Sequence, residues 1–391
     1  MAEFSQLTNL AMKILQVFNR YLEPGGEENS VARIANHLEL GRHDVERFWR
    51  SSEEWKGEGA PSRWRQVGLL GKNPEALQQL REVHESFQPQ LWILHNVIPV
   101  VSLGVYELAR ELGVPIVQWL HNYRPVSVSG TQTRSTYFRE IMSGSWRGSR
   151  VQTGILAYHF AQTRRRDHFD SVQAWIAVSD AVRGEFENAD WYSNRLATLR
   201  HSWDLCQDPG SGNAAEDYDL FLGRLTEEKG LRFLVKLYAE PEMQSKQLKI
   251  AGQGGLESEL RSISTPNVEW VGYVTGDEKR DLIHSCRAVL FPSLWAEPLS
   301  TIAYEAYEQR RPILTSDRGG MREIVENGVT GRVLGAGDLE AWKNAIIGDV
   351  DPSWGDAGRD WLETNVDPKI WNERFLEIIR EKIPSALEDG D

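Results

Sequence analysis

Two glutamates in the second half of the 391-residue sequence are spaced to hold one elongated ligand. Glu297 and Glu305 flank the expected start of a helix, whose first position suits Pro298 because proline lacks an N–H that would be unpaired there. The helical rise separates the two carboxylates by roughly 12 Å, which is too far for an acid/base pair but suits two ends of a ligand. The N–H groups of Leu299 and Ser300 favour a phosphate between them. A solvated helix face is the alternative interpretation.

Two basic side chains stand earlier, at another strand-to-helix junction. Arg224 and Lys229 follow the expected strand 219–222. A guanidinium fork and an ammonium point charge at this place can bind one diphosphate, and a surface pair is the alternative. Gly252 opens a glycine-rich segment after the next strand. It is weak evidence for a dinucleotide site, because no acidic residue follows at the offset that NAD enzymes need.

The first half of the chain has one candidate histidine and a glycine pair. His121 ends the expected strand 116–120, and ligands of open α/β sheets bind at such carboxyl ends. A structural hydrogen bond is the alternative role. Gly25 and Gly26 separate an opening strand from a helical pattern at 30–40, which is typical of a doubly wound α/β domain. The two glycines could equally serve only the turn.

The length of the chain and a polar, Gly-rich break in its middle predict two domains. The expected parts are an N-terminal acceptor-binding domain at 12–204, a linker at 205–217, a donor-binding domain at 218–368, and a C-terminal helix and tail at 369–391. The polar, Trp-containing segment 41–70 is expected to be a variable excursion outside the core. Asp217 and Asp219 form a D-x-D pattern that we interpret as linker polarity rather than a metal site.

These motifs resemble family 4 glycosyltransferases, which are retaining enzymes of the GT-B fold. The resemblance is carried by the E-x7-E spacing of Glu297 and Glu305, by GRLTEEKG at 223–230, by IAVS at 176–179 and by the segment 317–334. It implies an α/β fold with two Rossmann-like, doubly wound parallel-sheet domains facing a cleft, and a last helix that crosses back to the first domain. The sequence departs from the family at 201–203, where a turn motif keeps only Asp204, and at 307–310.

The resemblance also implies an activity. A sugar would move from a UDP-, GDP- or ADP-sugar to a hydroxyl acceptor of a glycan, a lipid-linked molecule or a small molecule. It implies that Glu305 binds the ribose, that basic side chains stabilise the leaving diphosphate, and that the enzyme needs no metal and no cofactor beyond the nucleotide-sugar co-substrate. The implied catalytic residues are His121, Arg224, Lys229 and Glu297, and the implied donor-binding residues are Gly26, Arg224, Lys229, Gly252, Glu297, Leu299, Ser300 and Glu305.

Charge and composition limit the partners. A net charge of −13 argues against nucleic acid. Arg124, Arg134 and Arg139 open an arginine-rich stretch that ends at Arg166. A solvated face is the default interpretation of such a stretch, and the functional interpretation is a surface that faces an anionic acceptor or a membrane headgroup layer. The sequence has only two cysteines, it lacks a long apolar run, and residues 1–11 do not have the character of a signal peptide. These features predict a cytoplasmic protein, with a peripheral position at the membrane as the alternative.

Two other functions stay open at this point. An epimerase or a phosphorylase on the same fold would use similar nucleotide or phosphate contacts. A non-catalytic subunit that binds a sugar nucleotide or a glycan would be consistent with the departures at 201–203 and 307–310.

Overall fold

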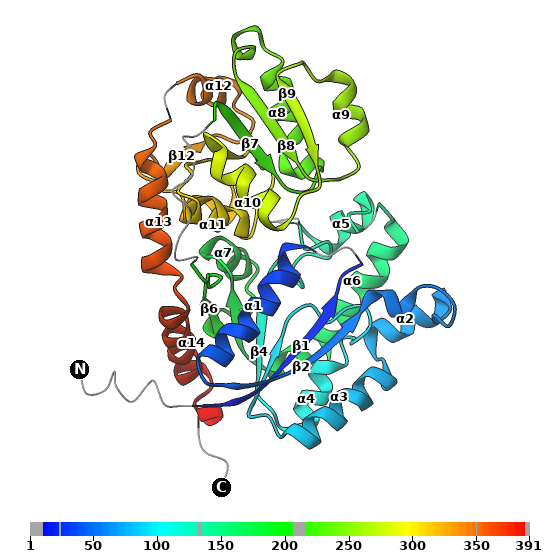
Figure 1. Cartoon of the computed structure of the whole chain (residues 1–391). Helices are drawn as coiled ribbons and strands as arrows, with labels where there is room; N and C mark the ends of the chain where they lie inside the picture. The colour runs from blue at the N-terminus through cyan, green and yellow to red at the C-terminus, as the bar shows by residue number, and fades with distance from the viewer. Residues whose placement is uncertain are drawn as a thin grey trace, which may run out of the picture. The chain divides into compact units, whose positions relative to one another are not determined.

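The computed structural model describes residues 11–22, 25–131, 135–146, 148–205, 216–348 and 350–387. The chain divides into two compact units, of which the first contains residues 1–202 and 368–391 and the second contains 203–367. Figure 1 shows the strands of each unit surrounded by its helices. Most of the predicted linker, at 206–215, lies outside the described residues.

The first unit is built on a six-stranded parallel sheet with the order β2-β1-β3-β4-β5-β6. Its inner strands are almost continuously apolar, as expected for a sheet covered on both faces. The strands are β1 (Lys13–Arg20), β2 (Asp44–Ser51), β3 (Leu91–Leu94), β4 (Ile116–Leu120), β5 (Val172–Ala177) and β6 (Leu196–Thr198). The strand order reverses between β1 and β3, and ligands of such sheets bind at the carboxyl ends beside this switch point.

Helices cover this sheet and connect its strands. They are α1 (Gly26–Leu40), α2 (Arg63–Gly71), α3 (Pro74–Phe87), α4 (Val105–Leu112), α5 (Tyr137–Ser143), α6 (Arg150–Arg165), α7 (Asp180–Asn188) and α14 (Pro368–Lys382). Short 3-10 turns lie at Ser52–Trp55, His168–Ser171, Ser193–Arg195 and Pro384–Leu387. The α14 helix belongs to the first unit although it follows the second unit in sequence: Trp371 stacks on Trp119, and the Asn372 amide donates to the carbonyl of His37 over 2.7 Å.

The prediction that segment 41–70 lies outside the core is wrong. The β2 strand pairs with all eight residues of β1, from Lys13 to Arg20, and so forms an edge of the sheet. Its sequence, DVERFWRS, reads as polar because an edge strand has to bury only one face. Phe48 is buried there.

The second unit has a parallel sheet of the order β12-β11-β10-β7-β8-β9, so the two doubly wound sheets that the sequence predicts are confirmed. Its strands are β7 (Tyr218–Leu222), β8 (Gln247–Ala251), β9 (Val268–Gly272), β10 (Ala288–Phe291), β11 (Ile313–Ser316) and β12 (Gly331–Leu334). Its helices are α8 (Leu231–Tyr238), α9 (Glu257–Ile263), α10 (Gly276–Ser285), α11 (Thr301–Glu308), α12 (Leu339–Ile347) and α13 (Ser353–Asn365), with 3-10 turns at Glu227–Lys229, Pro241–Met243 and Gly319–Glu323. This order is that of dinucleotide-binding folds, with its switch point between β7 and β10.

Asp219 is not a polar residue of the linker, so the interpretation from the sequence is wrong on this point. It is the second residue of β7 and is almost fully buried. Arg287 donates to both of its carboxylate oxygens, over 3.0 and 2.7 Å, and the Tyr238 hydroxyl donates over 2.6 Å. Burial raises the pKa of Asp219 while these partners lower it. The carboxylate is therefore committed to the core of the second unit.

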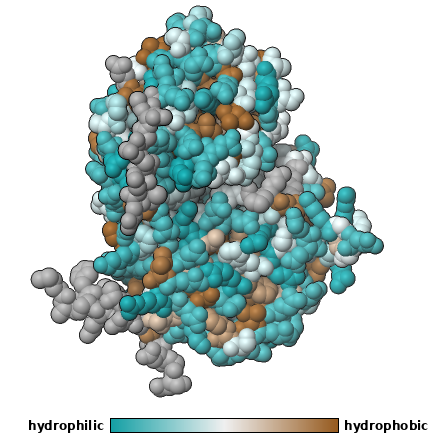
Figure 2. Space-filling model, viewed as in Figure 1, coloured by the Kyte–Doolittle hydropathy of each residue, from teal (hydrophilic) through white to brown (hydrophobic). Residues whose placement is uncertain are grey.

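No helix among the described residues is long and apolar enough to cross a bilayer. The face shown in Figure 2 is mostly hydrophilic, with apolar side chains scattered over it.

Candidate functional site

The switch point of the second unit brings two predicted segments together. Arg224 is the second residue after β7, and its exposed side chain has no ion-pair partner within the described ranges. The loop after β7 is tied to the loop after β8, because the Leu225 N–H donates to the carbonyl of Gln253 over 2.9 Å. Gly252 permits this contact: it has a φ of +144°, and a Cβ there would lie 1.9 Å from the carbonyl oxygen of Gly223. The structure thus gives Gly252 a packing role, and its contact with a donor stays a prediction.

Lys229 and Glu297 form an ion pair across this switch point, from the loops that follow β7 and β10. The other carboxylate oxygen of Glu297 accepts from the Ser293 hydroxyl over 2.9 Å. Gly230, with a φ of +74°, allows the close approach of the two loops, since a Cβ there would lie 1.9 Å from the carbonyl oxygen of Pro292. Two of the predicted catalytic residues are therefore in direct contact, which their separation in sequence does not reveal.

The helix after Glu297 begins later than predicted. The α11 helix starts at Thr301 with Ser300 as its N-cap, so Pro298 and Leu299 lie in the loop. The N–H groups at the N-terminus of α11 therefore belong to Thr301 and the residues after it, not to Leu299 and Ser300. The estimate of 12 Å along one helix fails for the same reason. Proline at the first helical position is a frequent choice, but proline is equally at home in a loop.

A glycine loop fixes the backbone of Glu297. The Gly320 N–H donates to the carbonyl of Glu297 over 2.8 Å. Gly319 has a φ of +61°, and a Cβ there would lie 2.1 Å from that same carbonyl oxygen. The predicted glycine-rich segment at 317–334 thus holds the backbone of Glu297 in place by a hydrogen bond and a close contact.

Glu305 has a partner that the sequence did not indicate. The Lys279 ammonium lies 2.8 Å from each carboxylate oxygen of Glu305, and both side chains are largely buried. Lys279 comes from α10, one of the helices packed against α11. A ligand hydroxyl that binds Glu305 must share this carboxylate with Lys279 or displace it.

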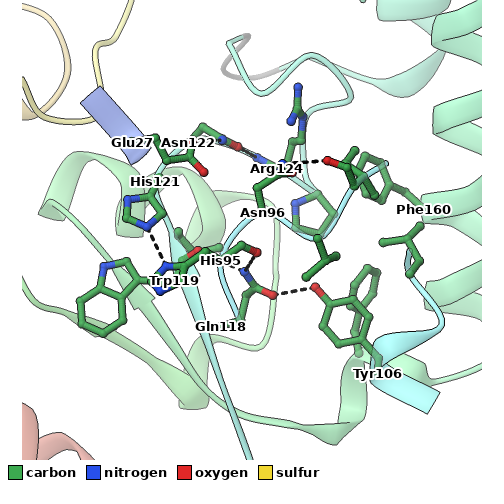
Figure 3. A pocket seen from close by; sticks show the side chains of 16 residues that line it. Glu27, His95, Asn96, Tyr106, Gln118, Trp119, His121, Asn122, Arg124 and Phe160 are labelled. Atoms are coloured by element: carbon green, nitrogen blue, oxygen red, sulfur yellow. Dashed lines mark hydrogen bonds between the residues drawn. The ribbon is translucent and has the colours of Figure 1, made fainter. Parts of the chain in front are cut away.

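A pocket in the first unit gathers other predicted residues at the carboxyl ends of β1, β3 and β4. Figure 3 shows Glu27, His95, His121, Asn122 and Arg124 around it. Gly26 begins α1 beside the pocket, and it does not line it. Sequence analysis missed Glu27, although its place directly after a glycine pair at a helix start was a usable signal.

Glu27 is an unusual carboxyl group. The Tyr21 hydroxyl donates to its Oε2 over 3.0 Å and the Asn122 amide over 3.4 Å, while Oε1 is buried with no hydrogen-bond partner among the described residues. Burial raises the pKa of Glu27 to about 7, against the lowering effect of Tyr21 and Arg124. It also raises the pKa of Tyr21. Glu27 can therefore accept or hold a proton near neutral pH.

Three histidines lie beside this pocket. His95 Nδ1 lies 2.9 Å from His121 Nε2, and the ring of His201 stacks on that of His121 at 5.8 Å between centroids. Burial lowers the pKa of His95 and of His201 to about 3 each, and lowers that of His121 well below its usual range. All three rings are neutral at pH 7. The departure from the family at His201 thus places an aromatic ring against His121.

Arg124 is held in the wall of the pocket. Its guanidinium lies 4.3 Å from the centre of the Trp146 ring and donates to the carbonyls of Val128 and Ser129. Arg139 is exposed on α5, and Arg134 lies outside the described residues. Glu140, which the sequence sets among these arginines, is instead fully buried and accepts hydrogen bonds from the N–H groups of the loop before α5.

No group of three or more His, Cys, Asp or Glu side chains in the described part of the chain is arranged to hold a metal ion. The basic groups at the β7–β10 switch point can supply positive charge to a diphosphate.

Comparison with known proteins gives the family of the second unit. Residues 217–348 match the family model of Glycosyl transferases group 1. The chain is 25% identical over 243 residues to an α-D-kanosaminyltransferase of Streptomyces kanamyceticus, with 59% of each chain covered. It is 27% identical over 329 residues to an α-maltose-1-phosphate synthase of Mycolicibacterium smegmatis, covering 74% of this chain and 78% of that one. The matches to the first curated relatives span between 30% and 59% of those proteins' own length.

The fold has solved relatives. Anabaena HepE in complex with UDP and glucose superposes with a TM-score of 0.66 at 17% identity, covering 94% of this chain and 99% of that one. Sucrose-phosphate synthase of Thermosynechococcus elongatus gives a TM-score of 0.68 at 15% identity, covering 94% and 98%. The predicted resemblance to glycosyltransferases of the GT-B fold is confirmed. Residues 217–348 are a glycosyl transferases group 1 domain, in a chain that has the GT-B fold.

Proposed function

We propose that the protein is a retaining, metal-independent glycosyltransferase of family 4. It transfers a sugar from a UDP-, GDP- or ADP-sugar to a hydroxyl group of a glycan, a lipid-linked molecule or a small molecule. The observation that carries the proposal is the Lys229–Glu297 ion pair at the β7–β10 switch point, with Arg224 in the same loop after β7. A sheet of this order binds nucleotides at that place. The UDP-glucose complex of Anabaena HepE supports a UDP-sugar as one candidate donor.

Each charged group has a role in this proposal. Arg224 and Lys229 bind the diphosphate and stabilise the charge that develops as it leaves, which is electrostatic catalysis by preorganised cations. Glu305 accepts hydrogen bonds from the two ribose hydroxyls. Glu297 orients the sugar through the carboxylate that Lys229 and Ser293 hold in place. No cofactor takes part beyond the nucleotide sugar.

The first unit supplies groups for the sugar and the acceptor. His121 orients the sugar, and the backbone at Gly26 approaches the ligand. Arg124 faces the acceptor, and Glu27 offers a carboxyl group that can bind the attacking hydroxyl. Arg134 and Arg139 belong to the same acceptor-side proposal.

We also propose a cytoplasmic location, with a peripheral contact to membrane headgroups as an alternative use of the 124–166 stretch. Phe138 on α5 and Val151 and Tyr158 on α6 are exposed near Arg139 and Arg150. Apolar side chains beside arginines are typical of surfaces that bind an anionic interface.

The departure at 307–310 has a packing explanation, so it does not favour a non-catalytic subunit. The Tyr307 hydroxyl donates to the carbonyl of Ile324 over 3.0 Å and lies 2.7 Å from the Thr330 hydroxyl. Gly358 on α13 makes room for its ring, since a Cβ there would lie 2.2 Å from Tyr307 Cδ1. Tyr307, the first of the larger residues at this helix end, therefore fills the core against α13.

The test measures release of the nucleoside diphosphate from UDP-, GDP- and ADP-glucose without added metal. We expect one donor to be turned over, and Lys229→Ala to lower kcat roughly 100- to 1,000-fold, as for loss of a charge-stabilising group. Lys343→Ala is the matched control, because Lys343 pairs with Glu340 on α12. The anomeric configuration of the product, followed by NMR, tests retention. Equal turnover by Lys229→Ala and the wild type would contradict the proposed site.

A further inference from the structure

A row of hydrogen bonds leads from the core of the first unit to its pocket. Gln16 lies in the middle of β1 and is fully buried. Its Nε2 lies 3.0 Å from His95 Nε2, and His95 Nδ1 lies 2.9 Å from His121 Nε2. Figure 3 shows the last of these contacts beside the pocket. Proton positions along this row follow from the groups at its start.

Trp49 fixes the orientation of the Gln16 amide. The indole N–H can only donate, and it lies 3.1 Å from Gln16 Oε1. At the other end of the amide, Nε2 donates to the carbonyl of Val31 over 2.9 Å, which can only accept. A rotation of the amide by 180° would place the Gln16 N–H groups against the Trp49 indole N–H, and Gln16 Oε1 against the carbonyl oxygen of Val31. Gln16 therefore presents an N–H to His95.

The hydrogen bond from Gln16 determines which nitrogen of His95 carries a proton, and so which group His95 presents to His121. Because His95 is neutral and accepts at Nε2, its single proton is on Nδ1 and is donated to His121 Nε2. His121 is neutral too, so its own proton is on Nδ1. That nitrogen is buried and has no hydrogen-bond partner among the described residues, and His121 lines the pocket. A buried N–H without a partner costs stability unless a ligand satisfies it.

We propose that Gln16, held by Trp49, is a positioning residue that acts through His95 to keep the proton of His121 on Nδ1, where it is donated to an oxygen atom of the bound sugar ligand. The part that concerns the ligand rests on the proposed glycosyltransferase function. The part that concerns the proton does not, because the free protein already sets it.

Other histidines of the same unit provide internal references. His84 Nδ1 accepts from the Trp92 indole over 3.3 Å and His43 Nδ1 accepts from the Met12 N–H over 3.1 Å. His159 Nε2 donates to the carbonyl of Val67 over 2.8 Å. These three rings must carry their proton on Nε2 when neutral, opposite to His95 and His121.

The experiment is a long-range 1H–15N correlation spectrum of the full chain, labelled with 15N-histidine and recorded near pH 8. The ring nitrogen that carries a proton is separated in chemical shift from the one that does not, and His95→Asn and His121→Asn assign the two rings. We expect protons on Nδ1 for His95 and His121, and on Nε2 for His43, His84 and His159. A proton on Nε2 of His121 in the wild type overturns the proposal.

Substitution of Gln16 tests the direction of the row. In Gln16→Glu, recorded at a pH where the new carboxyl group is ionised and His95 is neutral, the carboxylate can only accept, so His95 and then His121 move their protons to Nε2, while His84 is unchanged. If this variant does not fold, Gln16→Met removes the donor with little change in volume, and His121 then becomes a mixture of tautomers. An unchanged His121 spectrum in the folded variant refutes the relay. Gln78→Glu, on the exposed side of α3, controls for the added charge.

Turnover of UDP-, GDP- or ADP-glucose, whichever the wild type uses, tests the contact with the ligand. Gln16→Glu should lower kcat roughly 10- to 100-fold, the size expected for one lost hydrogen bond in a buried site. Its affinity for the matching free nucleoside diphosphate should be unchanged, because the residues proposed to bind the nucleotide lie in the second unit. A moved proton with unchanged kcat would refute the contact with the ligand. If the wild type itself turns over no nucleotide sugar, the proposed function fails and the spectra still decide on the relay.

Discussion

The ion pair between Lys229 and Glu297 allows stability and activity to be separated. Glu297 is 5% exposed, and the Lys229 side chain is 17% exposed. Lys229→Met leaves the carboxylate buried, with the Ser293 hydroxyl as its one remaining side-chain donor among the described residues. Removing one partner of a buried pair costs about 3–5 kcal/mol. Because Lys229 is not fully buried and Ser293 still donates, we expect a loss of about 2–3 kcal/mol of unfolding free energy.

The double variant Lys229→Met/Glu297→Gln should recover part of this loss. No buried charge is then left unpaired, so the coupling between the two sites should be about 1–2 kcal/mol. Scanning calorimetry of the variants measures this: for a unit of this size about 2–4 °C of melting temperature corresponds to 1 kcal/mol, so Lys229→Met should lower the transition by about 4–12 °C. Turnover should stay low in the double variant, because the diphosphate still lacks its lysine. Additive losses of stability, or a double variant as active as the wild type, would refute this reasoning.

Four further results are expected. Gly230→Ala should cost at least about 2 kcal/mol in denaturant unfolding because of its positive φ and the Pro292 carbonyl, whereas Gly255→Ala, with open space around it, should change stability by less than about 0.5 kcal/mol. Burial raises the pKa of Glu27 in the folded protein to about 7, so the wild type should lose stability relative to Glu27→Gln as pH rises from about 4.5 to 7. Above that range, the difference in melting temperature between the two proteins should stay constant. A difference in melting temperature that is independent of pH throughout would contradict this. Arg287→Met should cost about 3–5 kcal/mol in denaturant unfolding by leaving Asp219 unpaired in the core, against less than about 0.5 for Arg280→Met, whose partner Asp277 is exposed. Dialysis against EDTA should leave turnover unchanged, because Arg287 and Tyr238 occupy the Asp219 carboxylate; loss of activity that Mg²⁺ or Mn²⁺ restores would refute metal independence.

The sequence predicts the place of the candidate donor site because parallel sheets put ligands at strand ends. Arg224 and Lys229 follow one buried strand, Glu297 follows another, and both strands end at the same edge. The partners within the site were not predictable in the same way. The pairs Lys229–Glu297 and Lys279–Glu305 depend on loop paths that glycines and backbone hydrogen bonds set, and such contacts leave no periodic pattern in the sequence.

The errors have equally local causes. The β2 strand was missed because an edge strand alternates charged and apolar residues, and Asp219 was misread because its partners, Arg287 and Tyr238, are distant in sequence. The row from Gln16 to His121 was also invisible, since it depends on the directions of hydrogen bonds between separate strands.

The most direct test of the donor site is isothermal titration calorimetry with UDP, GDP and ADP and their glucose derivatives, in the absence of metal. One nucleotide class should bind to the wild type, Arg224→Ala should weaken this binding about 10- to 100-fold by loss of charge-assisted hydrogen bonds, and Arg110→Ala, an exposed arginine on α4 of the other unit, should leave it unchanged. Failure of every nucleotide to bind, or equal affinity of Arg224→Ala and the wild type, would contradict a nucleotide-sugar site at the β7–β10 switch point.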